Sequence, residues 1–291
     1  MTELKLWLAG ARTRTLGASI APVLVGTAVA SRHGPVIWWR AAAALVVAVA
    51  LQVGVNYAND YSDGVRGIDQ ARRGPLRLTA SGLVPPPAVK RAAVLSFAIA
   101  AVAGIALAVA VAWWLILVGA ACVLAAALYS GGPKPYASAG LGEVAVLVFF
   151  GFVATCGSAF VHQGQLPGQA VVAAFPLGLA ACAILLANNL RDVESDRIAG
   201  KRTLAVRVGA PATRRLYELC MLASAVGGPL ALAPRAPGAL AGLAALPLAV
   251  KPVRTIARPD ADAPSLVRAL VGTARFQLIL GVLLALGLWN W

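Results

Sequence analysis

The sequence predicts an all-α integral membrane protein with nine transmembrane helices. The 291-residue chain is 60% hydrophobic and only 12% charged, with a mean hydropathy of +0.80, whereas soluble domains carry roughly 25% charged residues. Apolar stretches close to the roughly 20 residues needed to cross a bilayer recur along the whole length. A water-soluble fold is therefore not expected, and helices rather than barrel strands are expected to cross the membrane.

Each predicted span is one of these apolar stretches. They lie at residues 16–31, 38–57, 92–111, 113–130, 141–161, 170–190, 216–233, 236–250 and 268–289.

The net charge of +14 could suggest a nucleic-acid partner, but the placement of the basic residues indicates a membrane topology instead. If the N-terminus is cytoplasmic, 21 of the 25 Lys and Arg residues fall in segments on the same side, and only Arg32, Arg40 and Arg235 fall on the other. The positive-inside rule then places the N-terminus and these basic segments in the cytoplasm, with the chain in the cell membrane. Six of the seven Trp residues are expected at the outer interface: Trp38, Trp39, Trp113, Trp114, Trp289 and Trp291.

Six of the eleven acidic residues crowd into two short windows. In the first, which continues the second predicted span into a loop, Asn59 and Asp63 are four residues apart and Asp60 is three residues before Asp63. Residues at these spacings share one broad face of a helix. Asp69 follows two glycines and is expected to fold back toward that face.

The second window repeats the pattern at the end of the sixth predicted span, where Asn188, Asp192 and Asp196 follow one another at four-residue steps. Glu194 lies on another face and is expected to be solvated. Each window precedes a basic, glycine-containing loop, at residues 74–79 and 200–204. The repeat, at an offset of roughly 130 residues, suggests a single domain of two related halves, residues 1–135 and 136–291, which meet around one polar site.

The composition of the windows points to a divalent metal and a phosphorylated ligand. Carboxylates at membrane helix ends are costly and repel one another, and carboxylate and amide oxygens suit Mg²⁺ or Mn²⁺ but not Zn²⁺. Several cations lie beside the acids, as expected where metal ions bridge a diphosphate. In a membrane, a diphosphate with an apolar remainder is a prenyl diphosphate. The alternative is that both windows are solvated loop ends whose acids balance nearby Lys and Arg.

Loss of diphosphate from a prenyl group leaves an allylic cation, which aromatic faces can shield from water. Aromatic residues near the expected depth are Tyr57, Tyr61, Tyr129, Tyr136, Phe149 and Phe150. Each of them also fits a packing or interfacial role.

Assembled in order, these motifs resemble the UbiA superfamily of intramembrane prenyltransferases over nearly the whole chain. The longer spacing from Asp63 to Asp69 looks like the branch that acts on 1,4-dihydroxy-2-naphthoate in menaquinone synthesis, rather than the ubiquinone branch. The segments that carry the resemblance are Arg12-Thr-Arg-Thr-Leu16, residues 56–69, Gly74-Pro-Leu-Arg-Leu78, Tyr129-Ser-Gly-Gly-Pro-Lys-Pro-Tyr136, Leu141-Gly-Glu143 and residues 188–209.

The resemblance implies nine helices around a central cavity with a lateral opening, Mg²⁺ dependence, and transfer of a polyprenyl group to the naphthoate with loss of CO₂, giving demethylmenaquinol. Asp63, Asp192 and Lys134 are then expected in catalysis, and Glu143 is either a proton acceptor for a ring hydroxyl or a structural partner of a basic residue. The implied metal ligands are Asn59, Asp60, Asp63, Asp69, Asn188, Asp192 and Asp196. The implied diphosphate-binding residues are Arg66, Arg77, Lys134, Lys201 and Arg202, with Arg14 contacting the diphosphate or the acceptor carboxylate.

Two alternatives stay open at this point. A related enzyme could use another acceptor, such as 4-hydroxybenzoate. A transporter would also carry intramembrane acids and repeats, although acids at helix ends rather than at the midplane argue against it.

Overall fold

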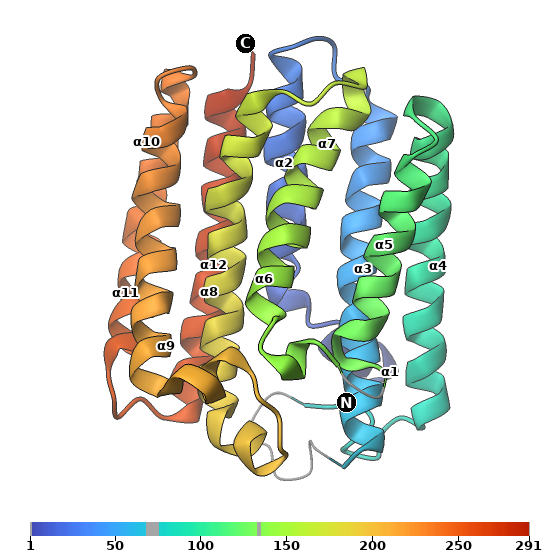
Figure 1. Ribbon diagram of the computed structural model, residues 1–291, viewed down its shortest axis with the longest axis vertical. Helices are drawn as coiled ribbons and strands as arrows, with labels where there is room; N and C mark the ends of the chain where they lie inside the picture. The colour runs from blue at the N-terminus through green and yellow to red at the C-terminus, as the bar shows by residue number, and fades with distance from the viewer. Residues whose placement is uncertain (1, 68–75, 133–134, 291) are drawn as a thin grey trace.

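Long, roughly parallel helices form a bundle in the computed structural model, which describes residues 2–67, 76–132 and 135–290 (Figure 1). The described residues contain helices and loops and no strands. In the first half the elements are α1 (Glu3–Gly10), η1 (Thr13–Thr15), α2 (Gly17–Ser31), α3 (Trp38–Val65), α4 (Pro86–Val111) and α5 (Leu115–Ser130).

The second half starts with the short turn η3 (Ala137–Ala139) and includes two π-helical segments, η4 and η5. Its further elements are α6 (Gly142–Val146), η4 (Leu147–Val153), α7 (Ala154–Gln163), α8 (Gly168–Ile198), α9 (Leu204–Leu222), η5 (Ala223–Gly227), α10 (Gly228–Leu232), η6 (Pro237–Ala245), α11 (Leu246–Ala257) and α12 (Ala263–Leu288).

The predicted all-α membrane fold is confirmed, but the count of nine spans is not. Among the described residues, six helices are long and apolar enough to cross a membrane, and the bent pair of α1–η1 and α2, with an angle of 52°, gives a possible seventh. The expected span at 113–130 corresponds to α5, which is apolar but only 16 residues long. The expected span at 216–233 is divided among α9, η5 and α10.

Helices α3 and α8 are longer than the membrane requires. They contain 28 and 31 residues, or roughly 42–47 Å at about 1.5 Å per residue, whereas the hydrocarbon core is about 30 Å thick. Their C-terminal turns lie at the same, lower end of the bundle in Figure 1. The excess length therefore carries the two acidic windows beyond the apolar layer.

Helix α8 is the most deeply packed of the long helices, with 67% of its most apolar window buried. Its contact with η4 depends on two glycines: a Cβ on Gly178 would lie 2.7 Å from Leu147 Cδ1 and 3.0 Å from Gly151 Cα. Close helix contacts through small residues are typical of membrane bundles, where tight packing drives association. This contact positions α6 and η4 against α8.

The opposite end of the bundle is joined by hydrogen bonds from Arg40 at the start of α3. Its guanidinium donates to the carbonyl oxygens of Val161 and His162 at the end of α7 and of Ala110 at the end of α4. One side chain thus satisfies unpaired helix-terminal carbonyls of two neighbours. Trp38 stacks on Trp289 at the same end, with ring centroids 5.8 Å apart.

We expect Gly178→Ala to lower the thermal unfolding midpoint of the detergent-solubilised protein, because the added methyl group forces η4 away from α8. Overpacking of this kind costs roughly 1–3 kcal/mol. The matched control is Gly157→Ala on α7, where a Cβ would meet nothing within 4 Å. Equal midpoints for the two variants would contradict the close contact.

Candidate active site

The two acidic windows meet at Lys201. Its Nζ lies 3.2 Å from Asp63 Oδ2 at the end of α3 and 3.8 Å from Asp196 Oδ1 at the end of α8. Gly200 has a left-handed φ of 72°, which ends α8, and the Lys201 N–H donates to the carbonyl of Asp196. The turn therefore brings the ammonium group back against the helix that it has just left.

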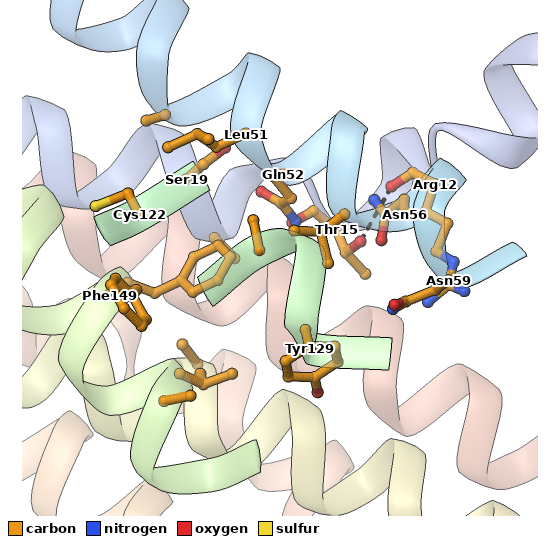
Figure 2. A pocket seen from close by; sticks show the side chains of 18 of the residues that line it. Arg12, Thr15, Ser19, Leu51, Gln52, Asn56, Asn59, Cys122, Tyr129 and Phe149 are labelled. Carbon is orange, nitrogen blue, oxygen red and sulfur yellow. Dashed lines mark hydrogen bonds between the residues drawn. The ribbon is translucent and has the colours of Figure 1, made fainter. Parts of the chain in front are cut away.

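A cavity of about 1240 Å³ extends from this polar end into the bundle. Figure 2 shows Arg12, Asn59 and Tyr129 toward one end of the pocket and Leu51, Cys122 and Phe149 farther along it. Among the residues that line its mouth are Arg12, Arg14, Asn59, Asp63, Arg77, Asn188, Arg191, Asp192, Asp196 and Lys201, whereas the remaining walls are mostly apolar. The cavity thus joins a charged mouth to an apolar chamber.

Arg191 belongs to the site, although the sequence indicated it only as one of the basic residues on the cytoplasmic side. Its guanidinium donates to both Asp192 oxygens, over 2.7 Å and 2.6 Å, and to Asn188 Oδ1 over 2.9 Å. The Arg191 side chain is only 3% exposed, so its charge is balanced within the protein. Its position between Asn188 and Asp192 in the window was the available signal.

Asn59 and Arg66 contact the end of α5. The Ser130 hydroxyl donates to Asn59 Oδ1, and the Arg66 guanidinium donates to the carbonyl oxygens of Ser130 and Gly132. Asn59 lines the cavity but Arg66 does not. The predicted diphosphate role of Arg66 is not supported by this arrangement, in which its guanidinium fastens the end of α5 to α3.

Asp60 anchors a loop instead of facing the other acids. It is 1% exposed, and its two oxygens accept hydrogen bonds from the backbone N–H groups of Leu78 and Thr79, each over 2.8 Å. This geometry argues against the predicted metal role for Asp60, because its carboxylate is directed at the loop backbone and Asp60 does not line the cavity. The anchored loop holds Arg77, which lines the cavity as predicted for a diphosphate-binding residue.

The N-terminal segment is attached to α3 through its main chain. Gln52 and Asn56 donate to the carbonyl oxygens of Thr15 and Ala11 over 2.9 Å each. Between these two attachment points lie Arg12 and Arg14, and both line the cavity mouth.

Two of the predicted substrate-contacting tyrosines lie elsewhere. Tyr57 donates to the Trp7 carbonyl and packs edge-on against its ring, with centroids 5.7 Å apart. Lys90 Nζ lies 5.8 Å from the ring centroid of Tyr61. Neither tyrosine lines the cavity, so the helical face that carries them packs against α1 and α4.

The other predicted aromatic residues do line the cavity: Tyr129, Tyr136, Phe149 and Phe150. Tyr129 and Tyr136 pack edge to face with centroids 5.5 Å apart, and the Tyr136 hydroxyl donates to the Ala125 carbonyl over 2.8 Å. Tyr136 lies between two spans, and burial raises its pKa to about 12. It therefore remains a neutral donor at physiological pH.

Arg202 is exposed and its side chain does not line the cavity, so its predicted diphosphate role is not supported. Its backbone N–H donates to the Ser138 carbonyl. Glu194 pairs with Arg197 at the surface, as expected for a solvated acid. The predicted site residues Asp69 and Lys134 lie outside the described residues.

Glu143 lies behind the cavity wall. It is 8% exposed and accepts a hydrogen bond from Asn189 Nδ2 over 2.9 Å. Asn189 lines the cavity, whereas Glu143 does not. Direct contact of Glu143 with a substrate, as a proton acceptor would need, is thus not supported by this geometry.

The possible metal-ligand atoms at the cavity mouth fit Mg²⁺ better than softer metals, because they are carboxylate and amide oxygens only. Within the described part of the chain, no three Asp, Glu, His or Cys side chains are gathered so as to hold an ion by themselves. Asp63 and Asp196 instead face the ammonium of Lys201, and Asp192 faces the guanidinium of Arg191. The site is suited to an ion that keeps positions for substrate oxygens.

The fold and the site together define an all-α membrane protein in which two acidic helix ends lie at the mouth of one large cavity with mostly apolar walls. More specifically, the chain belongs to the UbiA prenyltransferase family, which its residues 19–271 match.

Two relatives share the name 1,4-dihydroxy-2-naphthoate octaprenyltransferase. The Mycobacterium leprae protein is 43% identical over 98% of this chain and 96% of its own length. The Mycobacterium tuberculosis protein is 48% identical over 88% of each chain. A solved UbiA homolog from Archaeoglobus fulgidus, bound to DMAPP and Mg²⁺, covers 96% of this chain and 98% of its own with a TM-score of 0.59. At 14% identity, that structure establishes the fold.

We expect Lys201→Met to destabilise the metal-free protein, because Asp63 and Asp196 then face each other without the ammonium. Removing one partner of a buried ion pair costs on the order of 3 kcal/mol. Added Mg²⁺ should raise the thermal midpoint of this variant more than that of the wild type, since a ligand of the folded state stabilises it. Arg202→Met is the control, and the same midpoint and Mg²⁺ response in both variants would contradict the bridging role of Lys201.

Asp60→Asn should loosen the loop around Leu78, because an amide offers one acceptor where the carboxylate offers two. Losing a buried backbone partner costs roughly 1–3 kcal/mol, so tryptic cleavage after Arg77, measured by mass spectrometry, should become about 5- to 160-fold faster. Asp63→Asn makes the same chemical change one turn later on α3. It should leave this cleavage unchanged, because Asp63 contacts Lys201 and not the loop. Equal cleavage of the two variants would rule out the anchoring role.

Proposed function

We propose that this protein transfers a polyprenyl group from polyprenyl diphosphate to 1,4-dihydroxy-2-naphthoate with loss of CO₂, giving demethylmenaquinol and diphosphate. The observation that carries the proposal is the convergence of Asp63, Asp196 and Lys201 at the mouth of a cavity with otherwise apolar walls. The names of the two mycobacterial relatives support the naphthoate acceptor.

The donor binds with its diphosphate at the mouth and its isoprenoid tail in the chamber. Arg77 and Lys201 contact the diphosphate, as does Lys134, and Arg14 contacts either the diphosphate or the acceptor carboxylate from the N-terminal segment. Arg191 keeps Asn188 and Asp192 oriented toward the mouth through its three hydrogen bonds. The charged groups thus stay in the polar layer while the tail lies among apolar side chains.

Mg²⁺, with Mn²⁺ as a substitute, is the proposed cofactor, and the Archaeoglobus fulgidus homolog with bound DMAPP and Mg²⁺ supports it. When bound, the ion neutralises charge that develops on the departing diphosphate. The residues that would hold it are Asn59, Asp63, Asn188, Asp192 and Asp196, with Asp69 as a further ligand.

The chamber protects the allylic cation that forms at C1 of the prenyl group. Tyr129 and Phe149 present aromatic faces, which stabilise a nearby cation, and the apolar walls exclude the water that would otherwise capture it. The naphthoate ring carbon that bears the carboxylate forms the new bond to C1. Because CO₂ leaves from this carbon, the electrons of the broken bond restore the aromatic ring and no ring proton has to be removed there.

We further propose that the end with the active site faces the cytoplasm of the cell membrane. Lys201 and the basic segments around it lie at this end, while Arg32 donates to the carbonyl of Arg235 in a loop that the sequence assigns to the other side. The positive-inside rule favours this orientation.

The test is incubation of purified protein with 1,4-dihydroxy-2-naphthoate and labelled polyprenyl diphosphates of several lengths, with and without Mg²⁺. We expect prenylated product and an equal amount of CO₂ from carboxyl-labelled acceptor, and a rate loss of at least 10²-fold on chelation or in Asp63→Asn and Asp192→Asn. Glu194→Gln, an exposed acid in the same window, should retain wild-type activity. Prenylation of 4-hydroxybenzoate alone, or full activity in both aspartate variants, would refute the proposal.

A further inference from the structure

Glu143 is a buried carboxylate without a cation partner among the described residues. Its Oε1 accepts the hydrogen bond from Asn189, and its Oε2 is buried without a hydrogen-bond partner among the described residues. An ionisable side chain inside a membrane bundle is costly and usually has a function. The expectation that it pairs with a basic residue is not met in the described parts of the chain.

The contact with Glu143 determines which way the Asn189 amide faces. A carboxylate oxygen in this contact accepts, so the amide nitrogen must point toward Glu143. The amide oxygen then points away from it, and this oxygen accepts no hydrogen bond from any described residue. Asn189 is 9% exposed and lines the cavity, so its Oδ1 is the atom available to a ligand there.

The surroundings hold Glu143 rigidly against α8. Cys182 Sγ, two helical turns before Asn189, donates to the Glu143 carbonyl over 3.2 Å. The close approach of Gly151 and Gly178 positions the helix that carries Glu143. The Asn189 amide is therefore preorganised, which strengthens a polar contact with a ligand.

Asn189 also lies at the right level of the cavity for an acceptor ring. It precedes Asp192 by three residues, or about 4.5 Å along the helix axis, so it is one turn deeper than the acids at the mouth. Next to Glu143, a Cβ on Gly142 would lie 3.5 Å from the hydroxyl oxygen of Tyr129, which lines the same cavity. Polar groups from α5 and α8 therefore face the space beside the diphosphate site.

We propose that Glu143 is a positioning residue that holds Asn189 so that its Oδ1 accepts a hydrogen bond from one ring hydroxyl of the aromatic acceptor. The inference rests on the proposed function, because it assigns a subsite for the hydroxyaromatic acceptor of that reaction. Glu143 acts through Asn189 and touches no substrate. Truncation of Glu143 should weaken acceptor binding while leaving the polyprenyl diphosphate site intact.

The variants to compare are Glu143→Met, Glu143→Gln and Asn189→Leu, with the double variant of Glu143→Met and Asn189→Leu and the surface control Glu194→Met. We expect Glu143→Met and Asn189→Leu each to raise the KM for the acceptor about tenfold, the effect of roughly one lost hydrogen bond, with the KM for polyprenyl diphosphate within about twofold of wild type. The double variant should be no worse than Asn189→Leu alone, because both changes remove one interaction. Glu143→Gln should restore the acceptor KM to within about threefold of wild type, since its amide oxygen can accept from Asn189.

The contact itself is tested with two naphthoates, each of which lacks a different one of the two ring hydroxyls. Both are measured as competitive inhibitors against the dihydroxy acceptor. If Asn189 accepts from one hydroxyl, Asn189→Leu should raise the inhibition constant of the analogue that retains this hydroxyl about tenfold. The inhibition constant of the other analogue should not change. Equal weakening of both, or of neither, would overturn the proposal. This measurement uses a variant that retains Glu143, so it stands even where Glu143→Met does not fold.

Other outcomes would also overturn it. Loss of kcat in Glu143→Gln with an unchanged acceptor KM would make Glu143 a proton acceptor, and equal rises in both KM values in Glu143→Met would indicate general distortion. If the wild type prenylates a different hydroxyaromatic acid instead, the proposed function fails, and the same series measured with that acid still decides the role of Glu143.

Discussion

The ammonium of Lys201 shared between Asp63 and Asp196 is the interaction on which the rest of the site depends. It joins the end of α3 to the end of α8, two helices that are far apart in sequence. Two carboxylates that approach each other repel unless a positive charge lies between them or one of them is protonated. The same requirement makes this end of α3 and α8 suitable for a metal ion, whose positive charge can lie between the carboxylates. A diphosphate can then bind to the metal ion and the neighbouring basic groups.

The composition and the length of the apolar stretches were sufficient to predict the membrane fold, and helical periodicity was sufficient to predict the face of α8 that lines the cavity. Asn188, Asp192 and Asp196 all line it, because four-residue steps keep side chains on one stripe of a helix. The two related halves stay a prediction from the repeated windows.

The same periodicity could not predict which neighbour each side of a broad face would meet. Asp60 and Asp63 are three residues apart, yet Asp60 reaches a loop and Asp63 reaches Lys201. Tyr57 and Tyr61 lie on a side of α3 that packs against other helices, and Arg66 contacts the end of α5. These outcomes depend on how α1, α4 and α5 pack around α3, which is tertiary information.

The attachment of the N-terminal segment to α3 has a consequence for which substitutions would release it. Gln52 and Asn56 grip the peptide carbonyls of Thr15 and Ala11, and every residue type supplies such a carbonyl. A change of residue type at position 11 or 15 that keeps the backbone in place therefore leaves this attachment of Arg12 and Arg14 intact. Loss of either amide side chain of α3 removes one of its two hydrogen bonds.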